Sequence, residues 1–377
     1  MQALDYLRAL IAFPSVSSQS NVAVTNQAED WLWHMGFETE RVNYTDDRGV
    51  AKSNVIGRRG PCGVPGLAWF GHTDVVPATS WCYAESDPWT AHVSGGRVYG
   101  RGSCDMKGPV ACMLAAAAAI RSPQRAPLWI VLTADEEIGM HGARKVASAS
   151  RMYREIVETG SRAIIGEPTC LRVVHAHKGG RTLRAVSSGR AAHSSTGLGI
   201  NSNFALIPFL QEVALLNEQM ERAPEWRDER FTPPTPTMNL LITDPNTASN
   251  ITSPRSACTV YFRPMPGQRS DQAVQRLRDC ALRNGLEFEV LFSGDPLFTP
   301  PDAPFVRELL QLSGGTHPET VAYGTDGAVL PELSSPVVFG PGDIAQAHTD
   351  DEWISLEQLE QGTQLYRQAI DRWCVTG

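Results

Sequence analysis

The sequence predicts an α/β protein with a mostly parallel sheet and helices on both faces, plus an inserted smaller α+β domain with an antiparallel sheet. Over residues 1–180, short apolar runs of strand length alternate with helical patterns, and this rhythm returns over residues 294–377. Residues 181–293 contain strands and two helices without that alternation. The length of 377 residues exceeds what one core usually serves. We therefore expect the two outer parts to form one domain and residues 181–293 to form a second.

Each element of the first part follows from a local pattern. Helices are expected where apolar residues recur every three or four positions, at residues 4–11, 24–35, 109–121 and 143–149. Pro14 and Gly36 follow the first two, as residues that end helices usually do. Strands are expected at the alternating run 37–42 and at the apolar runs 67–70, 128–132 and 163–165. Gly95-Gly96 is the expected turn of a hairpin over residues 89–102.

The remaining elements are predicted in the same way. In the inserted domain, helices are expected at residues 201–217 and 271–284, and strands at 182–186, 238–243, 257–262 and 286–292. A Pro-rich stretch at residues 296–304 leads back to the first domain. The α/β pattern then resumes with a helix at 305–312, a strand at 337–339 and a helix at 356–373.

Composition and charge exclude several classes of protein. The net charge of −8 argues against binding to nucleic acid and to anionic membranes. The longest apolar block, residues 111–120, is too short to span a bilayer. Asp5 and Arg8 interrupt the apolar N-terminus, which therefore predicts an amphipathic helix and not a signal peptide. The eight Cys residues include no C-x-x-C pair, so we expect reduced thiols and a cytoplasmic protein.

Three consecutive carboxylates, Asp135-Glu136-Glu137, follow the continuous apolar run 128–132. A solvated acidic loop before a helix is the simplest interpretation of such a stretch. However, ligands bind at the carboxyl ends of strands in open α/β sheets. Buried carboxylates are costly unless they are paired or hold a cation. The stretch therefore indicates a cation site if other strand ends carry similar residues.

Five residues satisfy that condition, because they follow predicted strands or lie in loops of the two outer parts. They are His72, Asp105, Glu137, Glu167 and His348. Imidazole and carboxylate together are the ligand set of zinc, cobalt or manganese hydrolase sites, whereas structural zinc sites are rich in Cys. Asp74 lies two residues after His72 on the same side of an extended chain, so its carboxylate is expected to hold the His72 ring.

These residues lie in stretches that resemble the co-catalytic metal motifs of the family of acetylornithine deacetylase, succinyl-diaminopimelate desuccinylase and carboxypeptidase G. The stretches occur in the same order and span nearly the whole chain; they are residues 71–77, 100–108, 134–137, 166–169 and 347–348. The acetylornithine deacetylase branch is the most similar, through residues 176–179, 340–348 and 351–353. The loop Gly324-Thr325-Asp326-Gly327, in contrast, resembles the desuccinylase type.

The resemblance implies two divalent metal ions, zinc or cobalt. Asp105 would bridge both ions, His72 and Glu167 would complete one, and Glu137 and His348 the other. It also implies Glu136 as the general base, which takes a proton from the attacking water and returns it to the leaving amine. A cis peptide bond after Asp105 is a further expectation from the family.

In the inserted domain, the stretch Gly189–Ser195 resembles the family's lid, which implies a homodimer formed through this domain. His193 would then reach the partner's site and donate to the oxyanion. Asn250 and Arg263 match lid positions that bind a substrate carboxylate in relatives, and Thr325 lies near the expected pocket.

The resemblance implies hydrolysis of an N-acyl amino acid, with N-acetyl-L-ornithine of arginine biosynthesis as the leading substrate. Acetylcitrulline deacetylase, desuccinylase and dipeptidase activities remain open, as does a binding module whose site has decayed. A serine or cysteine hydrolase is not expected, because the sequence contains no G-x-S-x-G motif and no Cys in a nucleophile signature.

Overall fold

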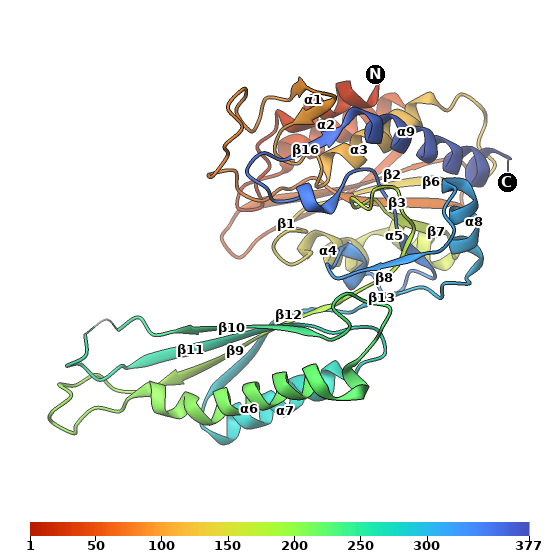
Figure 1. Ribbon diagram of the computed structural model, residues 1–377. Coiled ribbons are helices and arrows are strands. Elements are labelled where there is room, and N and C mark those ends of the chain that lie inside the picture. The colour runs from red at the N-terminus through yellow and green to blue at the C-terminus, as the bar shows by residue number, and fades with distance from the viewer. Residues whose placement is uncertain (247, 377) are drawn as a thin grey trace. The chain divides into compact units, whose positions relative to one another are not determined.

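The computed structural model describes residues 1–246 and 248–376, which fold as two compact units. The first unit consists of residues 1–176, 298–319 and 325–377, and the second of residues 177–297 and 320–324. The boundaries expected from the sequence lie after residues 180 and 293. Each unit has its own arrangement of helices around a sheet (Figure 1).

The first unit is built on a mixed sheet whose centre is parallel. Its strand order is β1 (Glu38–Thr45), β2 (Ala51–Arg59), β6 (Leu128–Thr133), β3 (Leu67–His72), β7 (Arg162–Ile165), β15 (Pro336–Val338), β8 (Val174–His177) and β13 (Leu297–Phe298), with β14 (Glu319–Val321) beside β8. Strands β6, β3, β7 and β15 pair in parallel, while β1, β2 and β8 join antiparallel. The predicted α/β class with a mostly parallel sheet is confirmed.

Helices cover both faces of this sheet (Figure 1). One face carries α1 (Ala3–Ile11), α2 (Val22–His34), α3 (Lys107–Ala119) and α9 (Leu356–Ile370), and the other carries α4 (His141–Ala149) and α5 (Arg151–Glu158). Helix α8 (Pro304–Ser313) packs against α9. A small sheet of β16 (Trp353–Ser355), β5 (Arg97–Tyr99) and β4 (His92–Ser94) contains the predicted hairpin. Helix α3 is apolar on every side because α1, α9 and the sheet surround it.

Strand β2 and helix α5 are among the elements of the first unit that were not predicted. Strand β2 reads as polar at Lys52, Ser53 and Asn54, yet all three side chains are buried. Two of these polar groups have partners far away in the sequence: Lys52 pairs with Asp135, and the Asn54 side-chain oxygen accepts from the Ala134 N–H. Helix α5 has only eight residues and begins directly after Ser150, which ends α4. Neither element therefore has a periodic pattern long enough to be recognised in the sequence.

The second unit is an antiparallel sheet with two helices on one face (Figure 1). The strand order is β10 (Thr237–Thr243), β11 (Arg255–Arg263), β9 (Gly180–Ser188) and β12 (Glu287–Gly294). Helices α6 (Ser202–Arg222) and α7 (Ser270–Arg283) pack on it through a core that includes Phe209 and Phe262. Helix α6 extends five residues beyond its predicted end at Asn217, to Arg222.

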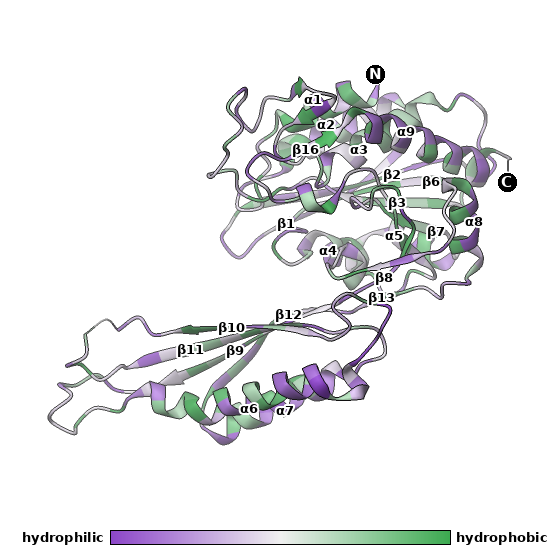
Figure 2. Ribbon diagram, in the orientation of Figure 1, coloured by the Kyte–Doolittle hydropathy of each residue, from purple (hydrophilic) through white to green (hydrophobic). Residues whose placement is uncertain are grey.

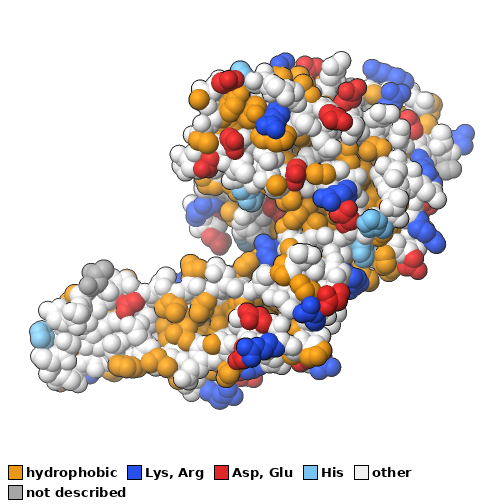
Figure 3. Space-filling view, in the orientation of Figure 1, with side chains coloured by type: hydrophobic (Ala, Val, Ile, Leu, Met, Phe, Trp, Pro, Cys, Tyr) orange, Lys and Arg blue, Asp and Glu red, His pale blue; other side chains and the backbone are white. Residues whose placement is uncertain are grey.

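Hydropathy varies along α6, which is more hydrophobic in its first turns and hydrophilic in its last ones (Figure 2). Apolar side chains are also visible on the surface of the second unit (Figure 3). On α6, the side chains of Phe204 and Leu215 are exposed. Across the described residues, no helix has the length and hydropathy needed to cross a membrane.

Candidate active site

Three neighbouring parallel strands end at the same edge of the first unit's sheet, in the order β6, β3, β7. His72 is the last residue of β3, Glu137 follows the end of β6 by four residues, and Glu167 follows the end of β7 by two. Residue 166, directly before Glu167, is a glycine because the backbone contacts the Trp69 indole there. A Cβ at residue 166 would lie 2.1 Å from Cζ2 of Trp69. This edge is where open α/β sheets bind ligands.

The five residues singled out from the sequence come together at this edge. Their potential ligand atoms form two groups, each with all atoms within 4.8 Å of one another: His72, Asp105 and Glu167, and Asp105, Glu137 and His348. His72 Nε2 lies 3.1 Å from Asp105 Oδ1 and 3.8 Å from Glu167 Oε1. His348 Nε2 lies 3.4 Å from Asp105 Oδ2 and 2.9 Å from Glu137 Oε2. Asp105 therefore presents one oxygen to each group.

Asp105 and His348 reach the site from loops and not from strands. Asp105 lies two residues before α3, and the Asp105–Met106 peptide bond is cis, as expected from the family resemblance. His348 follows a short 3₁₀ turn, η3 (Ile344–Gln346), and its backbone is left-handed with φ of 65°. A non-Gly residue at positive φ is uncommon and is often found at functional sites. Its side chain is 53% exposed, whereas His72 is buried.

Asp74 contacts the His72 ring more closely through its backbone than through its carboxylate. The His72 Nδ1 is 2.9 Å from the main-chain oxygen of Asp74 and 3.6 Å from its Oδ1. The carboxylate also accepts hydrogen bonds from the Ser17 hydroxyl at 2.7 Å and from the main-chain N–H groups of Glu136 and Glu137 at 3.2 and 3.4 Å. The backbone of Asp74 thus orients the His72 ring, and its side chain orients the acidic loop formed by residues 135–137.

The electrostatics of the cluster favour a bound cation. Burial, together with the neighbouring Asp105 charge, raises the pKa of Glu137 to about 7, and burial also raises the pKa of Glu136 and Glu167. Hydrogen bonds to Asp105 and Glu137 raise the pKa of His348 to about 10. These directions mean that the cluster carries excess negative charge, which bound protons or cations can offset.

The Glu137 carboxylate shows that the residues fit such a cation. Its Oε2 contacts His348, whereas its Oε1 is buried and has no hydrogen-bond partner among the described residues. A buried carboxylate oxygen without a partner is costly unless it coordinates an ion. The donor set of two imidazoles and three carboxylates also suits zinc or a similar transition metal.

The neighbouring Asp135 anchors the acidic loop from behind. Its carboxylate forms an ion pair with Lys52 in which both side chains are fully buried, and it accepts a hydrogen bond from the Tyr44 hydroxyl at 2.7 Å. Asp135 also has a left-handed backbone with φ of 58°. The β2 strand, which supplies Lys52, therefore fixes the residue directly before Glu136.

We expect Lys52→Met to destabilise the protein by about 3–5 kcal/mol, because it leaves the buried Asp135 carboxylate without its cation. Urea unfolding followed by circular dichroism measures this change. Lys145→Met is the matched control, since Lys145 is exposed on α4. A Lys52→Met variant as stable as the control would contradict a structural role for the pair.

Asp326 is a buried carboxylate near the cluster that the sequence analysis did not select as a site residue. Its Oδ2 accepts a hydrogen bond from the Thr133 hydroxyl at 2.6 Å, and its Oδ1 has no hydrogen-bond partner among the described residues. Its charge helps to raise the pKa of Glu136 and Glu167. No apolar run of strand length precedes Asp326, so the hydrophobic pattern did not mark it as a strand-end residue. The sequence pointed to it only through the resemblance of the loop 324–327 to the desuccinylase type.

The predicted substrate-contacting residues lie in different places. Thr325 is buried in the first unit, where its hydroxyl accepts a hydrogen bond from the Gly327 N–H. His193 and Asn250 lie on adjoining loops of the second unit, joined by a hydrogen bond from Ser194 N–H to the Asn250 oxygen. Arg263 is at the far end of β11, with its guanidinium 5.1 Å from the Tyr261 ring centre. A nine-residue strand spans roughly 25–30 Å, so Arg263 and Asn250 are not brought together within one chain.

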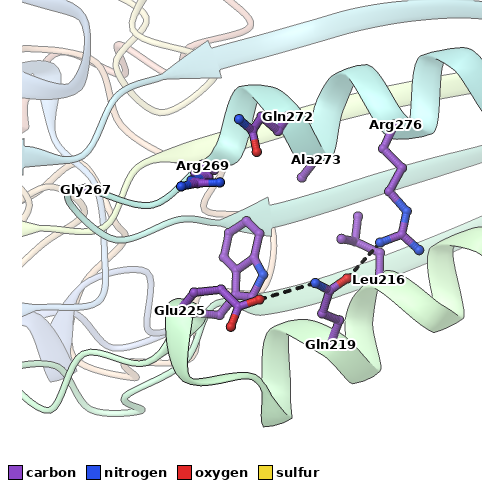
Figure 4. A pocket seen from close by; sticks show the side chains of 9 residues that line it. Leu216, Gln219, Glu225, Gly267, Arg269, Gln272, Ala273 and Arg276 are labelled. Atoms are coloured by element: carbon purple, nitrogen blue, oxygen red, sulfur yellow. Dashed lines mark hydrogen bonds between the residues drawn. The ribbon is translucent and has the colours of Figure 1, made fainter.

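A hollow of about 460 Å³ lies in the second unit between α6 and α7 (Figure 4). Its lining includes Trp226, Arg269 and Arg276. Arg276 pairs with Glu212 and donates to Gln219 at 2.8 Å, and Figure 4 shows the latter contact. The hollow is open to solvent, and Gln219 in its lining is bonded to both Glu225 and Arg276. We therefore place the candidate site at the carboxylate cluster and not here.

Comparisons with known proteins agree with this geometry. The model of peptidase family M20/M25/M40 matches residues 68–372. Acetylornithine deacetylase from Myxococcus xanthus is 35% identical over 98% of this chain and 96% of that protein. Acetylornithine deacetylase from Proteus mirabilis (strain HI4320) is 31% identical over 99% of this chain and 97% of that protein.

Solved structures show the same fold at lower identity. An M20 family metallo-carboxypeptidase from Sulfolobus solfataricus superimposes with a TM-score of 0.75 at 16% identity, covering 99% of both chains. The YXEP protein of Bacillus subtilis, described as a dinuclear metal binding peptidase from the M20 family, superimposes with a TM-score of 0.64 at 15% identity, covering 98% of this chain and 97% of that one. From the family match and the full-length relatives, the chain belongs to peptidase family M20/M25/M40, and it is a metal-dependent hydrolase of amide bonds.

Proposed function

We propose that the protein removes the acetyl group from N-acetyl-L-ornithine, or from a closely similar N-acyl amino acid, in arginine biosynthesis. The observation that carries this proposal is the pair of ligand groups that share Asp105. The full-length similarity to two acetylornithine deacetylases supports the acetyl group and the amine. The eight free cysteines are consistent with action in the reducing cytoplasm.

In this proposal, the residues hold two divalent ions, zinc or cobalt. His72 and Glu167 bind one ion, Glu137 and His348 bind the other, and Asp105 contributes one carboxylate oxygen to each. Bound ions of this kind lower the pKa of water and polarise the carbonyl that is attacked. His72 is buried, so its ligand group forms the inner end of the site. His348 is half exposed, so its ligand group forms the outer end.

Glu136 is the proposed general base. Burial, together with the neighbouring charges of Glu167, Asp326 and Glu137, raises the pKa of its carboxyl group. The Asp74 carboxylate accepts hydrogen bonds from the main-chain N–H groups of Glu136 and Glu137, and this fixes the backbone of both residues. A carboxylate of raised pKa is suited to take a proton from the attacking water and to return it to the nitrogen of the leaving amine.

A substrate panel tests the reaction and separates it from the related ones. N-acetylornithine, N-acetylcitrulline, N-succinyl-diaminopimelate and a dipeptide are each offered with added Co²⁺ or Zn²⁺. The highest kcat/KM is expected for N-acetylornithine. A preference for the succinyl substrate, to which the loop 324–327 points, would reassign the acyl group. Absence of turnover on every substrate, combined with absence of bound metal, would favour a decayed site.

Arg263 is proposed to bind the substrate carboxylate, because its planar guanidinium forms two parallel hydrogen bonds with such a group. Replacing the substrate carboxylate by an amide should lower kcat/KM by roughly 10- to 100-fold, and Arg263→Ala should remove that discrimination. Steady-state kinetics on both substrates measure the effect. The matched control is Arg278→Ala, on helix α7 of the same unit. Equal turnover of acid and amide by the wild type would exclude the role.

The proposed dimer forms through the second unit. Its edge strand β10 exposes Leu240, Leu241 and Ile242 by 40%, 54% and 56%. Exposed apolar side chains on an unpaired edge are typical of an interface. A dimer also explains why His193 and Asn250 lie a strand's length from Arg263, since each chain can supply its loops to the other's site.

We expect Leu241→Glu to convert the dimer to a monomer and to reduce kcat/KM, because a charge in the interface lacks a partner. Analytical ultracentrifugation gives the mass, and kinetics give the activity. The control Leu282→Glu changes an equally exposed leucine on α7. A monomeric wild type with full activity would refute the arrangement.

A further inference from the structure

We propose that Glu352 is a positioning residue that fixes the Asp105 segment for cation binding; the inference rests on the function proposed above. The Glu352 side chain is 1% exposed, and its carboxylate accepts hydrogen bonds from residues 101, 102, 104 and 105. Its Oε1 accepts from the main-chain N–H of Cys104 at 2.8 Å and of Asp105 at 2.9 Å. Its Oε2 accepts from the Gly102 N–H at 2.8 Å and from the Arg101 guanidinium at 2.9 Å.

The same carboxylate links two parts of the candidate site that are about 250 residues apart. Glu352 lies four residues after His348, and its main-chain oxygen accepts from the Gly100 N–H at 3.0 Å. Immediately beyond it, β16 pairs with β5. The segment that carries Asp105 and the segment that carries His348 are therefore hydrogen-bonded to each other through Glu352. Asp105 and His348 belong to the same ligand group, so this bonding sets their separation.

Only a carboxylate satisfies this arrangement. An ionised carboxylate accepts at both oxygens, whereas the Gln amide replaces one oxygen by a donor NH₂ group. In whichever orientation a Gln side chain is placed, its NH₂ faces two donors, and these lose their acceptor in a buried region. Because one of the four donors is the N–H of Asp105 itself, relief of this conflict displaces the shared ligand.

A purely structural role is the alternative, since Arg101 and Glu352 also form a buried ion pair. The two roles differ in what they predict for metal affinity. A residue that only stabilises the fold changes the free energy of unfolding and leaves the affinity of the folded protein for a cation unchanged. A positioning residue changes that affinity, and groups that orient metal ligands typically contribute 10- to 100-fold.

The experiment is a calorimetric titration of the full-length, metal-stripped protein with Co²⁺. For Glu352→Gln we expect Co²⁺ affinity to be 10- to 100-fold weaker than in the wild type. Glu40→Gln is the matched control, because Glu40 accepts from the main-chain N–H groups of Arg151 and Met152 and from the Ser150 hydroxyl at the start of α5. We expect Glu40→Gln to be less stable to heat and to bind Co²⁺ as the wild type does.

The outcomes separate this inference from the proposed function. A wild type that binds no Co²⁺ removes the proposed metal chemistry itself. A folded Glu352→Gln with wild-type Co²⁺ affinity overturns the positioning role and leaves the metal site intact. If Glu352→Gln does not fold, Arg101→Met replaces it, since it removes one of the four donors. A two- to tenfold loss of Co²⁺ affinity is then expected, and an unchanged affinity overturns the inference.

Discussion

Glu136→Gln is expected to lower kcat by roughly three to four powers of ten while the protein keeps its full complement of metal. The magnitude is the upper part of what a general acid–base group contributes. Gln has nearly the same shape as Glu but cannot take a proton from water. The structure separates Glu136 from metal binding, because the two ligand groups contain Glu137 and not Glu136. Single-turnover kinetics and elemental analysis of the same sample measure both quantities.

Glu137→Gln is the reciprocal control, and it should lose the ion that His348 contacts. Glu158→Gln, at the exposed end of α5, should change neither metal content nor turnover. If Glu136→Gln loses metal and keeps its residual activity when metal is restored, the two neighbouring glutamates have been assigned in the wrong order. If it keeps both metal and activity, Glu136 is a bystander.

The sequence predicted the edge of the sheet at which the site lies, for a clear physical reason. Parallel strands buried on both faces are continuous apolar runs, so the ends of β3, β6 and β7 are visible in the sequence. The polar residues at or just after these ends, His72, Glu137 and Glu167, had to lie close together once those strands were neighbours. The hydrophobic pattern predicted where the strands end, whereas the order of the strands in the sheet is known only from the structure.

Other parts of the site have no such signal. Lys52 and Asp326 are buried charges whose partners are far away in the sequence, and a charged residue in isolation indicates solvent exposure. The part played by the Asp74 main chain was also unpredictable, since the expected contact used its carboxylate. Glu352 was noticed only as part of a similar stretch, because its four donors belong to a loop about 250 residues earlier. These features arise from tertiary contacts and not from local pattern.

Removal of the metal is expected to abolish hydrolysis and to lower the stability of the first unit. A cation that binds only the folded state adds about 2.7 kcal/mol when its free concentration is 100 times its Kd. Without it, the carboxylates of Asp105, Glu137 and Glu167 repel one another in a buried region. Dialysis against a chelator, followed by urea unfolding with and without Zn²⁺, measures this difference. Activity should return when two equivalents of Zn²⁺ or Co²⁺ are restored.

Single histidine variants show how much each of the two ligand groups contributes to metal binding and to stability. His348→Ala should bind one ion in place of two, because His72, Asp105 and Glu167 remain as a complete group. His72→Ala should lose the other ion and also lose stability in its metal-free form, since it leaves a cavity in a buried position. The exposed His317→Ala is the control for both. Equal loss of both ions in both variants would mean that the ions bind as one unit through Asp105, and retention of two ions in either would mean that the histidine is not a ligand.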